Sequence, residues 1–244
     1  MPNPYFQFKQ FTVWHDKCAM KVGTDGVLLG TWATVNNTAL HNYKNSNPLS
    51  VLDVGTGTGL IAMIIAQRND NAIIDAIDID KDACKQAMEN IENSPFGNRI
   101  NVIHKSFTDY SAEKKYDLII SNPPFFKNSL KCPDEARSMA RHNDSLPLKQ
   151  LIEQASTMLS ENGRIALILP TQQSEDLDFI IATHRLYVAR RTEVISVEGH
   201  QPKRFLIELS TKISTGKEKS AIILETKNRE RTQQYIELTR EFYL

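Results

Sequence analysis

A turn with three glycines, between Asp53 and Leu60, is the first segment of this 244-residue chain whose residue types and spacing indicate ligand chemistry. Gly55, Gly57 and Gly59 let the backbone approach a ligand closely, and the helix expected to follow would offer free N–H groups. A dinucleotide-binding fingerprint requires a glycine where Leu60 stands, and a P-loop requires a lysine that this segment lacks. Both of these common glycine-rich sites are therefore excluded.

The pattern that remains, D-x-G-x-G-x-G, resembles the cofactor loop of methyltransferases that bind S-adenosylmethionine. That cofactor carries a methionyl amine and a carboxylate instead of a pyrophosphate. The side chain of Asp53 suits the amine, and the free N–H groups suit the carboxylate. A glycine-rich turn without a ligand is the alternative, but strand, acid, glycines and helix agree with one another here.

A second acid, Asp78, ends the apolar segment 72–78. It follows the glycine loop by roughly 20 residues, where Rossmann-type sites place the carboxylate that binds ribose hydroxyls. Asp80 is the expected cap of the next helix, because Asp is favoured at that position. We therefore assign the ribose to Asp78, with a purely capping or surface role as the alternative.

The most specific motif of the chain follows the apolar segment 116–121 and consists of Asn122, Pro123, Pro124 and Phe125. The prolines hold the backbone rigid and leave its carbonyl groups as acceptors. An aryl amine is a poor nucleophile because its lone pair is delocalised into the ring. The Asn122 side-chain oxygen and the Pro123 carbonyl would each accept one amine hydrogen and turn the nitrogen towards a methyl donor. Phe125 offers a stacking face worth about 1–3 kcal/mol; a rigid turn is the alternative for the motif alone.

These motifs follow short apolar segments that alternate with segments of helical spacing, which is typical of parallel strands covered by helices. The expected strands are 49–54, 72–78, 100–104, 116–121 and 163–169, and the expected helices are 25–33, 59–69, 80–93, 146–160, 171–183 and 231–241. Segments 187–197 and 204–212 predict an antiparallel hairpin at the sheet edge, followed by a short strand at 221–225. The fold class is α/β: a Rossmann-like, mostly parallel seven-stranded sheet with helices on both faces.

Composition is that of a soluble globular protein, with 41% hydrophobic residues, 24% charged residues and a formal net charge of zero. We expect a domain over 49–244, preceded by an N-terminal segment, 1–48, that packs on the ligand site. The three cysteines are widely separated, which indicates reduced thiols in a cytosolic protein without disulfides or a metal site. The chain starts without a signal-peptide pattern, and no apolar stretch approaches the roughly 18–20 residues of a membrane span.

Four segments together resemble the bacterial valine-tRNA (adenine-37-N6)-methyltransferases, which belong to the amino-methyltransferases with an Asn/Asp-Pro-Pro-Tyr/Phe motif. They are 11–30, 89–95, 122–125 and 241–244, and so they span nearly the whole chain. The resemblance implies a class I methyltransferase fold, S-adenosylmethionine as cofactor, and methylation of the adenine next to the anticodon of a valine tRNA. It also implies that 21–25 lines the cofactor or target pocket, with Lys21 and Thr24 as cofactor-binding residues. No obligatory protein partner is inferred.

One position departs from the wider methyltransferase pattern. Many of these enzymes have an acid after the third strand that binds the adenine of the cofactor, and Ser106 stands there in this chain. Its hydroxyl could bind the cofactor's amine, and the N–H of Phe107 could meet a ring nitrogen. Asp109, three residues later, is the alternative.

The zero net charge hides an asymmetry between two regions. Residues 51–120 carry 7 Lys/Arg against 11 Asp/Glu, whereas residues 185–219 carry 8 against 4. We expect phosphate contacts from four basic residues of the predicted hairpin, with an ordinary solvated face as the alternative: Arg190, Arg191, Lys203 and Arg204. Arg137 and Arg141, after the Asn122–Phe125 motif, are expected to order a lid over the target base.

Three classes of function stay open at this point. The favoured one is N6-methylation of an adenine in tRNA. The same chemistry suits a guanine N2 in rRNA, a glutamine N5 in a protein or an adenine in DNA, although DNA methylases usually need a target-recognition domain for which no insertion here is long enough. A catalytically silent scaffold is the third, and the intact Asp53, Gly55, Gly57, Asn122 and Pro123 argue against it.

Overall fold

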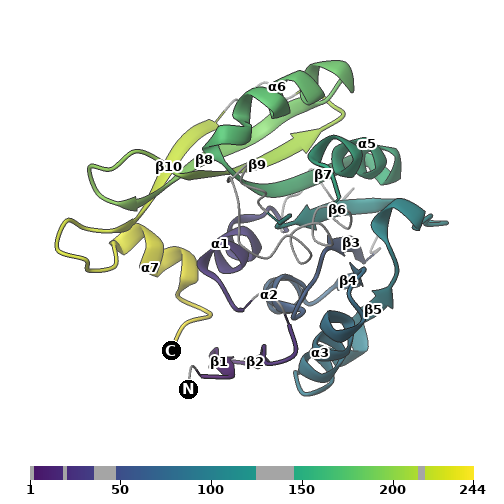
Figure 1. Cartoon of the computed structure of the whole chain (residues 1–244), viewed down its shortest axis with the longest axis horizontal. Helices are drawn as coiled ribbons and strands as arrows, with labels where there is room; N and C mark the ends of the chain where they lie inside the picture. The colour runs from purple at the N-terminus through teal and green to yellow at the C-terminus, as the bar shows by residue number, and fades with distance from the viewer. Residues whose placement is uncertain (1–2, 19–20, 36–47, 125–145, 214–217) are drawn as a thin grey trace, which may run out of the picture.

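A computed structural model describes residues 3–18, 21–35, 48–124, 146–213 and 218–244, and within them helices cover both faces of one large sheet (Figure 1). The sheet has eight strands in the order β10-β8-β9-β7-β6-β3-β4-β5. Their bounds are β3 Leu49–Val54, β4 Ala72–Asp78, β5 Ile100–His104, β6 Tyr116–Ser121, β7 Leu159–Pro170, β8 Tyr187–Val197, β9 Arg204–Ser210 and β10 Glu218–Glu225. The α/β class and the mostly parallel sheet are confirmed.

The position of the hairpin differs from the prediction. β8 and β9 pair in antiparallel fashion as expected, and β9 is also antiparallel to β7. However, β10 pairs in parallel with β8 and forms the edge of the sheet. The prediction of seven strands with the hairpin at the edge is therefore wrong in this detail, because the segment predicted as a short strand at 221–225 is longer and continues the sheet beyond β8.

Strand β3 lies between β4 and β6, parallel to both. Helices α1 (Thr24–Trp32), α2 (Leu60–Arg68), α3 (Lys81–Glu92) and α7 (Gln233–Thr239) contribute to the apolar core on one face. Helices α5 (Leu148–Met158) and α6 (Ser174–Thr183) contribute to the core on the other. Because both faces are covered, the central strands are buried on both sides, which explains their continuous apolar sequence.

The sequence analysis missed a small antiparallel pair near the N-terminus, β1 (Tyr5–Gln7) and β2 (Thr12–Trp14). Its neighbour Phe8 is buried and stacks on Phe11 with a centroid distance of 4.8 Å. The Lys9 N–H donates to the carbonyl oxygen of Phe242 at 2.9 Å, so the two ends of the chain lie side by side (Figure 1). Strands this short give no recognisable alternation in sequence.

Candidate active site

A pocket of about 500 Å³ lies beyond the carboxyl ends of β3, β4, β5 and β6. This is where open α/β sheets bind their ligands. Eight residues singled out from the sequence line it together: Gly55, Gly57, Asp78, Ser106, Phe107, Asn122, Pro123 and Pro124. The topology thus brings the three separate motifs to one place; this pocket is called the first pocket below.

The glycine loop supplies one wall of the first pocket. Gly55 and Gly57 have φ angles of +71° and +57°, and a Cβ atom on either would meet nothing within 4 Å. The loop therefore leaves open space where a side chain would otherwise stand, as a ligand cradle requires. Gly59 is different, because it does not line the pocket and a Cβ there would lie 3.2 Å from Ile91. Its place is the turn into α2, packed against α3.

Asp78 lies at the end of β4 and is aimed by two backbone groups. Its Oδ2 accepts from the Gly57 N–H at 2.8 Å, and its Oδ1 accepts from the Asp80 N–H at 3.0 Å. Burial raises the pKa of Asp78 above its ordinary value, although these N–H groups oppose the shift. The expected cap is confirmed, since Asp80 accepts from the N–H groups of Asp82 and Ala83 at the start of α3.

Asp53 lies beneath the glycine loop and lines neither this pocket nor the one described below. It is fully buried, and its Oδ2 accepts from the Thr56 hydroxyl at 2.7 Å. Its Oδ1 has no hydrogen-bond partner of normal geometry among the described residues. Burial raises the pKa of Asp53 to about 7. The contact that is visible therefore supports the loop, and the predicted contact with an amine stays a prediction.

The far end of the first pocket combines a hydroxyl with apolar surfaces. Ser106 lines it and shares a hydrogen bond of 2.8 Å with the Thr108 hydroxyl. Asp109, the alternative to Ser106, is exposed and is not part of the wall. Ile79 lines the pocket although it is 50% exposed, and Phe107, which is buried, lines it as well. The sequence analysis missed Ile79, whose only signal is an apolar residue between two acids just after a strand.

Asn122 follows β6 at the junction of two pockets. Its side-chain Oδ1 is buried and has no hydrogen-bond partner in the described part of the chain. The preceding Ser121 hydroxyl donates to the Val54 carbonyl oxygen at 2.7 Å and so ties β6 to β3 at this point. An unsatisfied buried acceptor is costly unless a ligand supplies a donor. The next residue of the motif after Pro124, Phe125, lies outside the described residues.

A second pocket of about 380 Å³ shares Asn122, Pro123, Pro124, Gly55 and Gly57 with the first. Its other walls are residues 21–26, the end of the glycine loop with the start of α2 (Thr56, Thr58, Leu60 and Ile61), and Arg204. The predicted Lys21 and Thr24 therefore lie here and not in the first pocket.

Asp25 and Arg204 form an ion pair of 2.9 Å on the wall of the second pocket. Burial raises the pKa of Asp25, and the nearby guanidinium opposes the shift. Asp25 is not the cap of α1, because that helix begins at Thr24 with Gly23 as the cap residue. Arg204 lies at the start of β9, and the sequence analysis placed it on an RNA-contacting hairpin without foreseeing this ion pair.

The four basic residues of the hairpin are not brought together on one surface. The Arg190 guanidinium lies over the Trp32 ring at 4.2 Å, on the face of the sheet that α1 covers. The Arg191 guanidinium lies over the Phe205 ring at 4.1 Å, and Phe205 belongs to the core on the opposite face. Adjacent residues of a strand point to opposite faces, which is why the predicted basic cluster is divided.

One further expectation stays a prediction, and one residue without a predicted role lies in the first pocket. Arg137 and Arg141, proposed to order a lid, lie outside the described residues. Cys18, which carried no role in the sequence analysis, lines the first pocket, and burial raises its pKa to about 12. Among the described residues there is no group of three potential metal ligands, and no helix is both long and apolar enough to cross a membrane.

The known proteins that this chain resembles in sequence are methyltransferases. The family model of the methyltransferase small domain matches residues 36–184. The chain is 49% identical to the tRNA1(Val) (adenine(37)-N6)-methyltransferase of Parabacteroides distasonis over 100% of this chain and 99% of that protein. It is 45% identical to the protein of the same name from Bacteroides thetaiotaomicron, with the same coverage of both chains.

Among solved structures, the fold is similar to that of a predicted O-methyltransferase from Agrobacterium tumefaciens. The TM-score is 0.66 at 18% identity, covering 89% of this chain and 96% of the other. A ribosomal protein L11 methylase from Lactobacillus delbrueckii gives a TM-score of 0.52 at 19% identity over 77% of each chain. At these identities the likeness concerns the fold alone. Residues 21–26 and Arg204 lie outside the family-model match, whereas the two relatives align over the whole chain.

Proposed function

This chain belongs to the tRNA1(Val) (adenine(37)-N6)-methyltransferase family, and we propose that it transfers a methyl group from S-adenosylmethionine to the N6 amine of an adenine in tRNA. The observation that carries the proposal is the buried Oδ1 of Asn122, which has no hydrogen-bond partner among the described residues, lies where the two pockets meet and is followed by two prolines. An acceptor without a donor at this place suits a substrate N–H group.

The residues of the first pocket fit the adenosyl part of S-adenosylmethionine. The open space at Gly55 and Gly57 admits a ligand backbone contact, and Asp78 presents a carboxylate for two ribose hydroxyls. The apolar surface of Ile79 suits the flat face of a purine, while Ser106 and the N–H of Phe107 suit its edge. When bound, this cofactor supplies an electrophilic methyl group on a sulfonium.

The second pocket would then receive the methionyl end near the Gly55–Thr58 loop and the target adenine near Asn122. Lys21 and Thr24 are proposed to hold the methionyl carboxylate. Residues 21–26 and Arg204 belong to the part of the chain that is shared with the tRNA-modifying relatives and lies beyond the general methyltransferase match. This supports a target-selecting role for the second pocket.

The chain's own groups act on the amine by orientation. Asn122 Oδ1 accepts one amine hydrogen and the Pro123 carbonyl accepts the other, so the nitrogen turns out of conjugation and presents its lone pair. The lone pair would take the methyl group that the bound cofactor supplies, and the amine would then lose one proton to solvent. Neither acceptor is a base; both lower the barrier by holding a geometry that the free base avoids.

A direct test is methyl transfer from labelled cofactor to total tRNA, total rRNA and total protein in parallel. We expect label in tRNA, in an N6-methyladenosine found after digestion to nucleosides. An unmodified valine tRNA transcript should accept one methyl group, and the same transcript with guanine in place of adenine 37 should accept none. Label in rRNA or protein instead would support the alternative amine targets, and no transfer would support a silent scaffold. A tRNA substrate would place the enzyme in the cytosol.

A further inference from the structure

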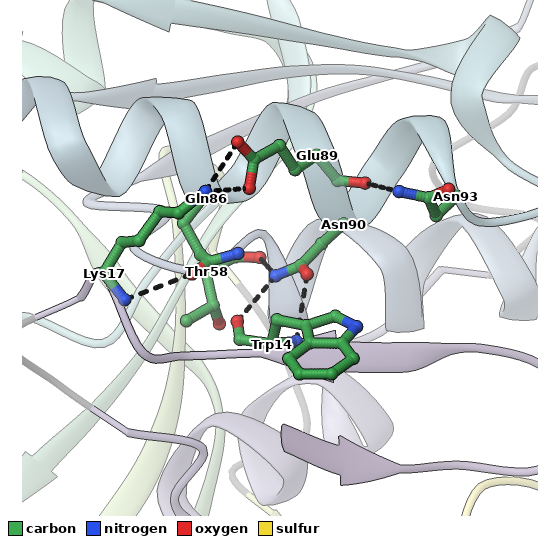
Figure 2. A network of polar contacts seen from close by, with 7 residues as sticks. All are labelled: Trp14, Lys17, Thr58, Gln86, Glu89, Asn90 and Asn93. Atoms are coloured by element: carbon green, nitrogen blue, oxygen red, sulfur yellow. Dashed lines mark hydrogen bonds and ion pairs between the residues drawn. The ribbon is translucent and has the colours of Figure 1, made fainter. Parts of the chain in front are cut away.

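Residues Trp14–Cys18, called the strap below, are held by one face of α3 (Figure 2). The strap's first residue is bound at both of its backbone groups by Asn90: the Trp14 N–H donates to Asn90 Oδ1, and Asn90 Nδ2 donates to the Trp14 carbonyl, each at 2.9 Å. One turn earlier on α3, Gln86 Oε1 accepts from the Lys17 N–H at 3.2 Å. The Lys17 ammonium pairs with Glu89 at the surface.

Asn90 makes one further bond, to the glycine loop. Its Nδ2 also donates to the Thr58 carbonyl at 2.9 Å, so both amide hydrogens and the amide oxygen are used. The side chain is 1% exposed. This pattern admits one orientation of the amide, because a reversed amide would place its oxygen against two carbonyl groups and its hydrogens against the Trp14 N–H.

The two segments that Asn90 joins are walls of the site. The strap ends at Cys18, which lines the first pocket, and leads towards residues 21–26, which line the second. Thr58 itself lines the second pocket, and the loop before it lines both. The helix that carries Asn90 is capped by Asp80, another wall residue of the first pocket. One buried amide thus connects three pieces of wall that are far apart in sequence.

We propose that Asn90 is a positioning residue for methyl transfer, which fixes the strap, and with it the wall residue Cys18, against the glycine loop. It touches neither pocket, and it acts through Trp14 and Thr58. The inference rests on the proposed function, because methyl transfer is the step whose geometry depends on both walls.

The test compares two asparagines of the same helix end under the same substitution. Asn90→Asp keeps an acceptor for the Trp14 N–H but loses both donors. Asn93→Asp is the matched control, because Asn93 is exposed and, among the described residues, its Nδ2 donates to the Glu89 carbonyl alone, at 2.7 Å, away from strap and loop (Figure 2). Three quantities are measured well below the unfolding transition: cofactor affinity by calorimetry, single-turnover methylation of tRNA at saturating cofactor, and amide hydrogen exchange of the strap.

We expect Asn90→Asp to exchange faster over the strap and to lose up to about 100-fold in single-turnover rate, as misplacement of reacting groups does. Asn93→Asp should stay within about twofold of the wild type, as surface substitutions do. If the two variants match in strap exchange and in rate, the positioning role is overturned. A purely structural role would lower thermal stability without changing the rate of the folded, cofactor-saturated enzyme.

A second variant keeps the proposal testable if Asn90→Asp does not fold. Gln86→Met removes the Oε1 atom that accepts from the Lys17 N–H of the strap, and it leaves Asn90 and Thr58 in place. In this variant the backbone amides near Lys17 should exchange faster than in the wild type, and the single-turnover methylation rate should fall less than in Asn90→Asp. Amide exchange and a methylation rate equal to those of the wild type would count against the proposal. Failure of the proposed function is recognised separately, because the wild type would then methylate no tRNA while cofactor affinity and strap exchange still report on the walls.

Discussion

The two pockets meet at Asn122, yet they are built by different kinds of contact. The first is lined mainly by residues that directly follow four adjacent parallel strands, β3 to β6. Its chief polar group, Asp78, is aimed by the N–H groups of nearby loop residues. The second pocket combines residues 21–26, the glycine loop and the start of β9. Its polar wall is held by an ion pair between Asp25 and Arg204, which come from distant parts of the chain.

This difference predicts a division of labour. Parallel strands deliver their loops to the same edge whatever the rest of the chain does, so the first pocket suits a cofactor shared by many enzymes. The second pocket depends on segments that can change without disturbing the sheet, and it suits a target that differs between enzymes. Changes at Asp78 in the first pocket should therefore act on the cofactor, whereas changes at Asp25 or Arg204 in the second pocket should act on RNA.

The largest expected effect is on the pH dependence of stability, and it comes from Asp53 beneath the glycine loop that the two pockets share. Burial raises the pKa of Asp53 from 3.8 to about 7. A carboxyl whose pKa is higher in the folded state binds a proton on folding, so its contribution to stability is present below about pH 4 and is lost as the pH rises to about 7. At about 1.4 kcal/mol per pKa unit, the loss amounts to as much as about 4 kcal/mol. Asp53→Asn should remove this part of the pH dependence, measured by urea unfolding across that range.

Parallel stability–pH curves for the wild type and Asp53→Asn would contradict the assignment. The same measurement at saturating cofactor tests the predicted contact with the methionyl amine. If the cofactor flattens the wild-type curve, a positive charge has come close to the carboxylate; an unchanged curve would leave Asp53 with its loop contact to Thr56 alone.

Asn122→Ala removes one of the two proposed acceptors at the junction. The fold and cofactor affinity should hold, while the single-turnover rate on a tRNA transcript should fall by about 10²–10³, as for loss of one preorganised polar group. The interaction is made mainly in the transition state, so kcat should fall more than KM rises. A near-normal rate at saturating cofactor would show that Asn122 does not orient the amine, and the silent-scaffold and different-target readings would regain weight.

Asp78→Ala tests the first pocket alone. A hydrogen bond to a charged group contributes about 1.5–3 kcal/mol, so cofactor affinity should fall by about one to two decades. Asp80→Asn is the control, because Asn also caps helices and the residue lines the same pocket. Calorimetry should find the control near the wild type; equal losses in both variants would move the ribose contact away from Asp78.

Arg204→Met tests the second pocket. It should raise KM for tRNA by about tenfold, the equivalent of one charge-assisted hydrogen bond, and leave cofactor affinity unchanged. Because the variant leaves the half-buried Asp25 without its cation, the double variant with Asp25→Asn should recover stability without recovering KM. Were cofactor affinity to fall as well, the proposed division between the pockets would not hold.

The same contrast explains how much could be predicted from sequence. The strands β3 to β6 and helices α2 and α3 follow from local periodicity, and Asp78, Asn122 and the glycines follow from their positions at strand ends. The number of strands and the strand at the edge of the sheet were predicted wrongly. The pairing of β10 with β8, which extends the sheet, cannot be recognised from the sequence of β10 alone. Asp25–Arg204 and the Asn90 contacts could not be derived, since no local pattern reports which distant segments meet.

The smallest effect on RNA binding is expected in the hairpin of β8 and β9, whose predicted RNA contacts were based on charge alone. Arg190 and Arg191 lie over aromatic rings on opposite faces, whereas Lys203 is exposed. Neutralising a residue that contacts a phosphate lowers the slope of log K against log salt by about 0.7–0.9. We therefore expect Lys203→Gln to lower the slope for tRNA binding by up to that amount, with cofactor affinity unchanged.

Arg190→Met should instead reduce stability, because the guanidinium covers Trp32 and donates to its carbonyl. If Arg190→Met changed the salt slope of tRNA binding strongly, Arg190 would contact RNA after all. If Lys203→Gln left the slope unchanged, the RNA would bind elsewhere on the enzyme.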